Sequence, residues 1–224
     1  MLLTAIQTTL QAHADATRAP AMRAYMREQF TFLGITTPIR RAVCKDLLRN
    51  KQSAPELLAL AQQLWQCEER EYQYVALDLL ARHWKSLRLT ELDQLLALAQ
   101  QKSWWDTVDG LAGIVGDMVR AARQQDPAAQ DCMDAALAHP NLWVRRIAML
   151  HQLGWRAQTD TTRLFAYALQ LAAEEDFFIR KAIGWALRDY AHFAPEAVRS
   201  FLAQDGQVLS SLTRREAGKH LDKD

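Results

Sequence analysis

The sequence predicts an all-α protein built as a HEAT-like or armadillo-like helical-repeat solenoid with a concave binding face. Three observations predict this fold. Apolar residues recur at three- and four-residue spacings, period-two strand patterns are missing, and two segments about 35 residues apart resemble each other. We expect roughly ten to twelve helices, each about 10 to 18 residues long and joined by short loops.

The individual helices are predicted by their apolar stripes and their start signals. Apolar stripes of helical spacing lie at 57–65, 75–80 and 92–99. Polar residues typical of a helix start stand at 53–56, 90–91 and 126–127. Each of the six prolines stands where a new helix can begin: Pro20, Pro38, Pro55, Pro127, Pro140 and Pro195.

An internal echo indicates repeats. Segments 141–148 and 176–183 each contain a polar opener, an aromatic, a β-branched residue, a basic pair and an apolar pair, and segment 71–76 echoes them faintly. Such spacings suit one or two helix pairs per repeat, and stacked repeats expose a concave face that binds extended partners. Because no Gly/Ser-rich linker interrupts the chain, we expect one continuous domain over residues 1–224.

Composition indicates an intracellular globular protein. The chain has 224 residues, 50% of them hydrophobic, which suffices for a sizeable core. Cys44, Cys67 and Cys132 are odd in number and widely separated, which argues against a disulfide framework and against a zinc site. The start of the chain lacks a basic leader, and no apolar run approaches the roughly 20 residues of a membrane span. We therefore expect a cytoplasmic location and no membrane partner.

The charge is close to neutral but unevenly distributed. The net charge is +1, yet residues 1–51 hold eight Lys/Arg against three Asp/Glu, residues 52–134 hold seven against thirteen, and residues 135–224 hold twelve against ten. Basic ends around an acidic middle suit a protein that grips a phosphate backbone and keeps a carboxylate at the point of action. The alternative is a set of ordinary solvated helix faces.

The octet 102–109 has the most unusual composition in the chain, with two adjacent tryptophans and two aspartates. On a helix, Trp105 and Asp109 are four residues apart and share a face, so an aromatic ring and a carboxylate can address one bound group. Trp104 and Asp106 are expected to be structural. The alternative for any of these residues is a core tryptophan, or an acid that is solvated or paired.

Three further segments carry candidate residues. One of Arg145 and Arg146 can face the concave surface and bind a phosphate, or pair with a neighbouring acid. Gly184 stands in mid-helix before Trp185, which indicates close approach by a packed helix or by a ligand. Two arginines in the first turn of the last helix, 214–215, are unfavourable there unless an anion binds.

Other catalytic patterns are missing. The six histidines form no metal-binding spacing, and phosphate-binding loop and serine-hydrolase elbow motifs are not found. Gly113 and Gly116 lie in an apolar helical stretch and indicate close helix packing. Cys44, near Lys45 and Arg41, is a weak candidate nucleophile. We expect no metal and no cofactor.

Five strings together resemble the AlkD-type DNA alkylation repair glycosylases. They are Met22–Met26, Phe32–Pro38, Lys102–Asp109, Lys181–Arg188 and Arg214–Ala217. The resemblance runs from about residue 20 to about residue 220, and the Lys-Ser-Trp-Trp-Asp and Lys-Ala-Ile-Gly-Trp strings are its most specific parts.

The resemblance implies a HEAT-like superhelix that holds duplex DNA in its concave face and removes cationic N3- and N7-alkylated purines, such as 3-methyladenine and 7-methylguanine, without base flipping. It places the catalytic carboxylate at Asp109, the lesion-side tryptophans at Trp105 and Trp185, and the key arginine at Arg146. The candidate DNA contacts are Tyr25, Lys102, Arg145, Arg188, Arg214 and Arg215.

The expected chemistry needs no general acid, because an alkylated purine already carries positive charge and leaves as a neutral base. A carboxylate and indole faces then stabilise the cationic sugar. We expect a monomeric, monofunctional glycosylase without lyase activity. The alternatives are a non-catalytic HEAT-like protein that recognises damaged or branched DNA, and a helical-repeat scaffold for protein partners.

Overall fold

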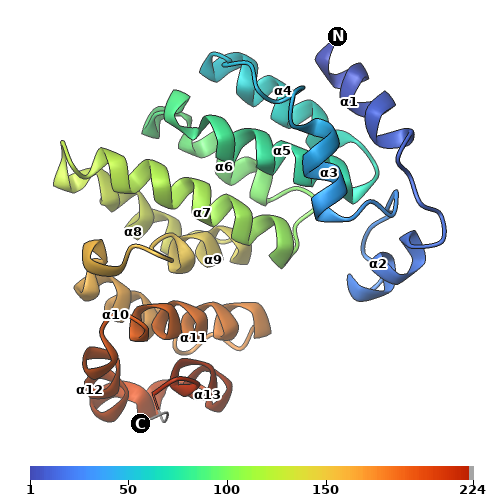
Figure 1. Cartoon of the computed structure of the whole chain (residues 1–224). Helices are drawn as coiled ribbons and strands as arrows, with labels where there is room; N and C mark the ends of the chain where they lie inside the picture. Colours follow the sequence, from blue (N-terminus) through green and yellow to red (C-terminus); the bar gives the residue numbers. More distant parts are fainter. Residues whose placement is uncertain (222–224) are drawn as a thin grey trace. The chain divides into compact units, whose positions relative to one another are not determined.

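Helices make up all of the regular secondary structure in residues 1–221, the part of the chain that the computed structural model describes. In that part no strand is present, and thirteen α-helices are accompanied by five short 3₁₀ turns, labelled η1 to η5 (Figure 1). The predicted all-α class is therefore confirmed.

The chain divides into two compact units, Met1–Lys102 and Ser103–Asp224. Within the first unit, α4 packs against α5 and α6, and α3 packs against α1 and α5. Its helices are α1 Leu2–Gln11, α2 Ala19–Tyr25, α3 Thr37–Cys44, α4 Ala54–Gln66, α5 Arg70–His83 and α6 Leu92–Ala99, with η1 Trp84–Ser86 and η2 Leu89–Glu91. The continuous domain over residues 1–224 stays a prediction, and its last three residues lie outside the described part.

The second unit is a helical repeat. Helices α7, α9, α11 and α13 pack one against the next, α8 lies on α9, and α10 and α12 lie on α11. Its helices are α7 Trp105–Ala122, α8 Asp131–Leu137, α9 Leu142–Leu150, α10 Thr161–Gln170, α11 Phe177–Ala191, α12 Pro195–Asp205 and α13 Ser211–Gly218, with η3 Pro127–Gln130, η4 Arg156–Gln158 and η5 Gly206–Val208.

The sequence echo marks equivalent positions in this repeat. The Asn141 side chain caps α9 by accepting from the Trp143 N–H at 2.9 Å, and the Asp176 side chain caps α11 by accepting from the Phe178 N–H at 2.7 Å. These caps satisfy backbone donors that a helix start leaves free. The echo therefore reflects two successive helices of one row, which confirms the repeat architecture. The concave face stays a prediction.

The predicted helix lengths are wrong for several helices. In the described part, α2 and α8 have 7 residues, α3, α6 and α13 have 8, and α9 has 9. At α6 and α8 part of the helical segment is a 3₁₀ turn, η2 or η3, that runs directly into the α-helix. One helical segment thus becomes two short elements.

The start signals at 53–56 and 126–127 are confirmed, whereas residues 90–91 lie inside η2 and place no side-chain cap on α6. The Ser53 N–H donates to the Glu56 carboxylate at 3.0 Å, and the Asp126 carboxylate accepts from the Ala128 N–H at 2.9 Å. Five of the prolines occupy the first turn of α2, α3, α4, η3 and α12. The sixth, Pro140, stands directly before the α9 cap.

A buried carboxylate fixes the segment after α2 in the first unit. Both oxygens of Glu71 accept backbone N–H bonds, from Leu33 at 3.0 Å, Gly34 at 2.9 Å and Ile35 at 3.0 Å. Gly34 has φ +86°, and a Cβ there would lie 2.1 Å from the Asp15 carbonyl oxygen. Only glycine fits this turn. The conformation of residues 33–35 therefore depends on both Gly34 and the buried Glu71 carboxylate.

Cys44 is poorly suited to act as a nucleophile. Its side chain is buried in the first unit, and this burial raises the pKa of the thiol to about 11. The thiolate needed for attack is therefore scarce at neutral pH, which corrects the sequence-based candidate. Among the described helices, none has the length and apolar character needed to cross a membrane.

Two helix glycines mark close packing within the second unit. A Cβ at Gly184 would lie 2.5 Å from the Glu216 Cβ of α13, and a Cβ at Gly116 would lie 2.0 Å from the His151 carbonyl oxygen. A packed helix, one of the two readings of Gly184, is therefore confirmed. Gly113, in contrast, is exposed and would have no atom within 4 Å of its Cβ.

We predict that Gly184→Ala destabilises the protein by about 2 kcal/mol, because the added methyl group forces α11 and α13 apart. The matched substitution Gly113→Ala should stabilise by up to about 1 kcal/mol, because alanine favours an exposed helix interior. Urea unfolding measures both. Equal stability of the two variants would show that α11 and α13 do not pack this closely.

Candidate active site

The octet lies where the second unit begins. Trp104 is the N-cap residue of α7, and Trp105 is the first residue of the helix. Trp105 and Asp109 therefore stand one turn apart on one face of α7, as the spacing predicted, and both are half-buried. Val108, between them in sequence, is fully buried and anchors the adjacent face of the turn in the core.

Asp109 is held by Arg146 of the neighbouring helix α9. The Arg146 Nε lies 2.7 Å from Asp109 Oδ1, and Nη2 lies 2.9 Å from Oδ2, which makes a bidentate ion pair. The third nitrogen, Nη1, donates to the carbonyl oxygen of Phe178 on α11. The Arg146 side chain is 1% exposed, whereas that of Asp109 is 22% exposed. The arginine is thus enclosed by protein, and the carboxylate keeps an open side.

Burial raises the pKa of the Asp109 carboxyl above its ordinary value. The hydrogen bonds and positive charge of Arg146 oppose this shift, and the nearby Asp106 carboxylate adds to it. An ionised Asp109 is therefore a partly desolvated anion that gains from any positive charge placed against its open side.

Trp185 lies among three cations. The guanidinium carbon of Arg146 is 5.5 Å from the centre of its ring, the Lys181 ammonium is 5.9 Å away, and the guanidinium carbon of Arg188 is 5.9 Å away. Lys181 and Arg188 stand four residues before and three residues after Trp185 on α11, so all three share one helix face. The Trp185 indole N–H is buried and has no hydrogen-bond partner among the described residues.

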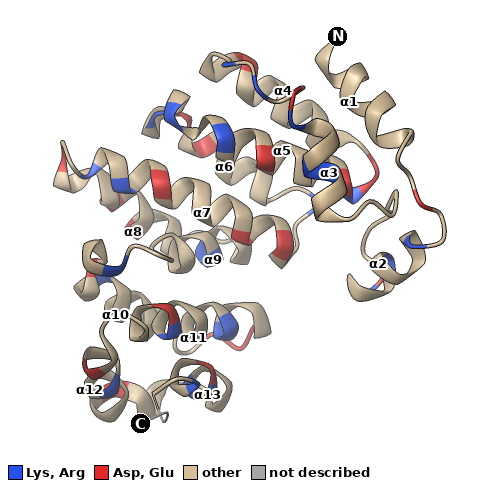
Figure 2. Ribbon diagram, in the orientation of Figure 1, with Lys and Arg blue, Asp and Glu red and all other residues tan. Residues whose placement is uncertain are grey.

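Glu216 of α13 binds the cations beside Trp185. Its carboxylate lies 2.9 Å from the Lys181 ammonium, 3.0 Å from the Arg188 guanidinium and 3.0 Å from the Lys219 ammonium. Burial would raise the pKa of Glu216, but hydrogen bonds and charge from the two lysines lower it to about 2. Figure 2 shows the basic and acidic segments on both α11 and α13.

An aromatic cluster closes the ends of three helices of the row. The Trp104 ring lies 5.0 Å from Phe178 and 6.1 Å from Trp143, and Trp143 lies 5.0 Å from Phe178. These contacts join the starts of α7, α9 and α11. This packing is what a structural role for Trp104 predicts.

The remaining candidate residues of the second unit differ in how far other side chains and the backbone engage them. Arg145 pairs with Glu174 at 2.7 Å and donates to the carbonyl oxygens of His139 and Pro140. Pairing with an acid, the alternative for the Arg145 and Arg146 positions, is therefore confirmed for both residues. Arg214 and Arg215 are exposed on α13, at its fourth and fifth positions, past the first turn. Contact of these residues with DNA stays a prediction.

Two candidates belong to the first unit. Tyr25, the last residue of α2, has 73% of its surface exposed. The Lys102 ammonium donates to the backbone carbonyls of Gln66 and Cys67 at the end of α4, where burial lowers its pKa. Lys102 thus caps a helix, and a phosphate contact by it stays a prediction.

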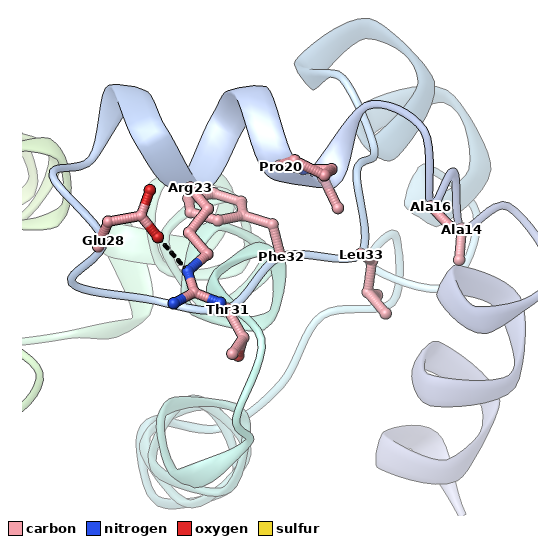
Figure 3. A pocket seen from close by; sticks show the side chains of 9 residues that line it. Ala14, Ala16, Pro20, Arg23, Glu28, Thr31, Phe32 and Leu33 are labelled. Carbon is pink, nitrogen blue, oxygen red and sulfur yellow. Dashed lines mark ion pairs between the residues drawn. The ribbon is translucent and has the colours of Figure 1, made fainter.

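Neither described cavity has candidate catalytic residues in its lining. The first, of about 480 Å³, lies in the first unit beside the Arg23–Glu28 ion pair and is floored by Pro20, Phe32 and Leu33 (Figure 3). The second, of about 490 Å³, lies in the second unit, and Asp134, Arg163 and Tyr167 are among the residues that line it. Among residues 1–221, no three His, Cys, Asp or Glu side chains are grouped so as to hold a metal ion.

Sequence reasoning named Trp105, Asp109, Arg146 and Trp185 as site candidates, and the structure brings Asp109, Arg146 and Trp185 together. It gave no role to four residues that surround them: Lys181, Glu216, Trp143 and Phe178. Lys181 and Glu216 are 35 positions apart, and this repeat-length spacing of opposite charges is also close to the 37 positions from Asp109 to Arg146. A comparison of charges at the repeat period was the signal that could have found the Lys181–Glu216 pair.

The fold and the site together define a class: a helical-repeat protein with a carboxylate, an arginine and tryptophans gathered on successive helices of a row. The chain belongs to the family described as "DNA alkylation repair enzyme", which matches residues 6–221.

Solved structures agree. A predicted DNA alkylation repair enzyme from Enterococcus faecalis is similar at 34% identity over 94% of this chain and 98% of that one, with a TM-score of 0.86. AlkD2 from Streptococcus mutans shares the fold, with 19% identity over 80% of this chain and 86% of that one and a TM-score of 0.62. So does smu.31 from Streptococcus mutans UA159, with 16% identity over 99% and 100% and a TM-score of 0.66. No curated protein sequence matches the chain.

We predict that Arg146→Met destabilises the protein by about 3 kcal/mol at pH 7.5, because it leaves the Asp109 carboxylate without its buried partner. This destabilisation should become smaller as the pH is lowered toward 5. Without Arg146 the folded-state pKa of Asp109 rises further above its unfolded value, so the penalty acts above that pKa and vanishes when the carboxyl is protonated.

Urea unfolding at the two pH values measures this effect. Arg120→Met is the control, because Arg120 pairs with Asp117 on the surface of α7 and its loss should change stability by less than about 1 kcal/mol. A pH-independent loss in Arg146→Met would contradict the assignment of the penalty to Asp109.

Proposed function

We propose that this protein is a monofunctional DNA glycosylase that hydrolyses the N-glycosidic bond of cationic N3- and N7-alkylated purines, such as 3-methyladenine and 7-methylguanine, in duplex DNA. The observation that carries the proposal is the Asp109–Arg146 pair, in which a partly exposed carboxylate is fixed by an enclosed arginine. Membership of the DNA alkylation repair family supports alkylated DNA as the substrate.

The residues suit a substrate that is already positively charged. When the C1′–N bond breaks, the purine leaves with the bonding electrons as a neutral base, and positive charge passes to the sugar. The Asp109 carboxylate stabilises that charge, and the faces of Trp105 and Trp185 add negative ring potential. Water then bonds to C1′ and gives its proton to Asp109, as with the second carboxylate in glycoside hydrolysis. The cationic leaving group makes a general acid unnecessary.

Arg146 orients the carboxylate in this mechanism and does not compete for the substrate. Each Asp109 oxygen accepts one bond from the guanidinium and keeps a further lone pair for the sugar or the water. A buried guanidinium with its nitrogens engaged by Asp109 and Phe178 holds the carboxylate within a narrow range of positions. The arginine is thus a positioning residue of the proposed reaction.

The absence of lyase chemistry is part of the proposal. A lyase step needs a free amine to attack the sugar. The ammonium beside Trp185 belongs to Lys181 and is engaged by Glu216, and the Lys102 ammonium is engaged by backbone carbonyls. We also propose that the base is not flipped into a pocket, because the partly exposed Asp109 carboxylate suits direct contact with the sugar.

We predict that Asp109→Asn lowers single-turnover release of 7-methylguanine from a duplex oligonucleotide by at least about 100-fold, because the neutral amide cannot stabilise the sugar cation. DNA binding should persist, because the variant adds no negative charge. Chromatography of the released base and a gel-shift titration measure the two properties.

Asp117→Asn is the matched control, since Asp117 lies on the same helix in an exposed pair with Arg120. It should keep the full rate. Full activity of Asp109→Asn would contradict the proposal. DNA binding by the parent protein without release of any cationic base would instead favour a non-catalytic DNA-binding protein.

We predict that the release rate falls as the pH decreases through the pKa of Asp109, with a midpoint above the value of about 3.9 typical of aspartate. The direction follows because burial raises this pKa and only the ionised carboxylate is active. Single-turnover rates between pH 4.5 and 8, corrected for spontaneous base loss from DNA alone, give the midpoint. A corrected rate that stays constant down to pH 4.5 would contradict this assignment.

A further inference from the structure

Glu216, like Asp109, is a carboxylate that pairs with cations beside the Trp185 ring. Its side chain is only 4% exposed, and it bonds to Lys181, Arg188 and Lys219. Two of these partners, Lys181 and Arg188, are the cations that flank the Trp185 ring on α11. Glu216 therefore fixes where these two positive charges stand relative to the ring.

The backbone brings Glu216 to this place. Gly184, directly before Trp185, leaves room for the Glu216 Cβ, and the Thr213 hydroxyl on the same helix as Glu216 donates to the Arg180 carbonyl oxygen at 3.0 Å. The carboxylate is thus carried to the Trp185 face of α11 by helix packing. A mid-helix glycine costs about 1 kcal/mol relative to alanine, so this close approach has a measurable cost that its contacts must offset.

The arrangement mirrors the Asp109–Arg146 pair one repeat away. Arg146 on α9 and Lys181 on α11 occupy equivalent positions of the sequence echo, each pairs with a carboxylate on a neighbouring helix, and both face Trp185. The two acids differ in exposure, 22% for Asp109 and 4% for Glu216. Asp109 can meet a substrate, whereas Glu216 reaches it only through other side chains.

The negative charge of Glu216 partly neutralises the positive charge beside Trp185. Lys181, Arg188 and Lys219 carry three positive charges, and Glu216 supplies the negative charge among them. Positive charge near Trp185 favours binding of phosphates but opposes the formation of a cationic sugar beside the same ring. A site that must do both needs its cations placed accurately and partly neutralised.

We propose that Glu216 is a positioning residue for the excision reaction: it holds Lys181 and Arg188 beside Trp185 and offsets their charge, so that the site binds DNA and still tolerates a cation on the sugar. This inference rests on the proposed glycosylase function and adds a residue to it. If Glu216 has this role, its loss slows base release and leaves DNA binding intact. A merely structural role would weaken both together.

The test is Glu216→Gln, compared with the parent protein on a duplex that contains one 7-methylguanine. Removing one negative charge at this range should slow single-turnover release about tenfold. DNA affinity should be unchanged or higher, and its salt dependence unchanged or steeper, because the variant is more positive. Thermal unfolding by circular dichroism reports the folded fraction, to which rates and affinities are normalised.

Two further variants make the result specific. Asp78→Asn also removes one negative charge from an acid that pairs with two cations, but this acid lies in the first unit, where it pairs with Arg40 and Arg41. This variant should keep the parent release rate. The double variant Glu216→Gln with Lys219→Gln restores the charge balance, because the half-exposed Lys219 pairs with Glu216, and it should recover part of the lost rate.

A parent-like release rate in Glu216→Gln, or a loss of release and binding together that the double variant does not relieve, would overturn the inference and leave the glycosylase proposal standing. If the parent protein itself releases no base, the glycosylase proposal fails, and this inference fails with it.

Discussion

The bidentate ion pair between Asp109 and Arg146 is the interaction on which the rest of the site depends. One buried guanidinium ties α9 to α7 through the carboxylate, to α11 through the Phe178 carbonyl oxygen, and to the face of Trp185. Three successive helices are therefore set around a single side chain. Breaking such a pair leaves a buried charge uncompensated, so the sequence cannot exchange either partner alone without large cost. The same pair that stabilises the repeat also aims the carboxylate.

Charge compensation explains why a nearly neutral chain suits a polyanionic substrate. Around Trp185 the basic residues outnumber the acids, yet the half-buried Asp109 and the buried Glu216 each bond to them directly. A surface with uncompensated lysines and arginines binds phosphates more tightly but opposes a developing sugar cation. The net charge of +1 is thus consistent with a repair enzyme whose basic residues are placed locally. The average over the chain says little about the site.

The sequence predicted what depends on local pattern. Helical spacing, the Ser53 and Asp126 start signals and the caps at Asn141 and Asp176 gave the all-α repeat, because these signals act within a few residues. The composition and helical spacing of the octet singled out Trp105 and Asp109. Resemblance to a family added the expected roles of Arg146 and Trp185. What it missed are contacts between helices about 35 residues apart, such as Glu216 with Lys181, since pairing across a repeat depends on how helices pack. The predicted helix lengths were wrong for a different reason: at α6 and α8 a 3₁₀ turn runs directly into a short α-helix.

The central claim is that this chain breaks the glycosidic bond of a cationic purine. The most direct measurement is incubation of the unmodified protein, in excess, with duplex DNA that contains 7-methylguanine, followed by chromatography of the free bases and electrophoresis of the strand. The account predicts release of 7-methylguanine with an intact abasic strand, which breaks only on later alkaline treatment. Absence of released base above the spontaneous rate would contradict it, and strand cleavage without alkali would contradict the monofunctional assignment.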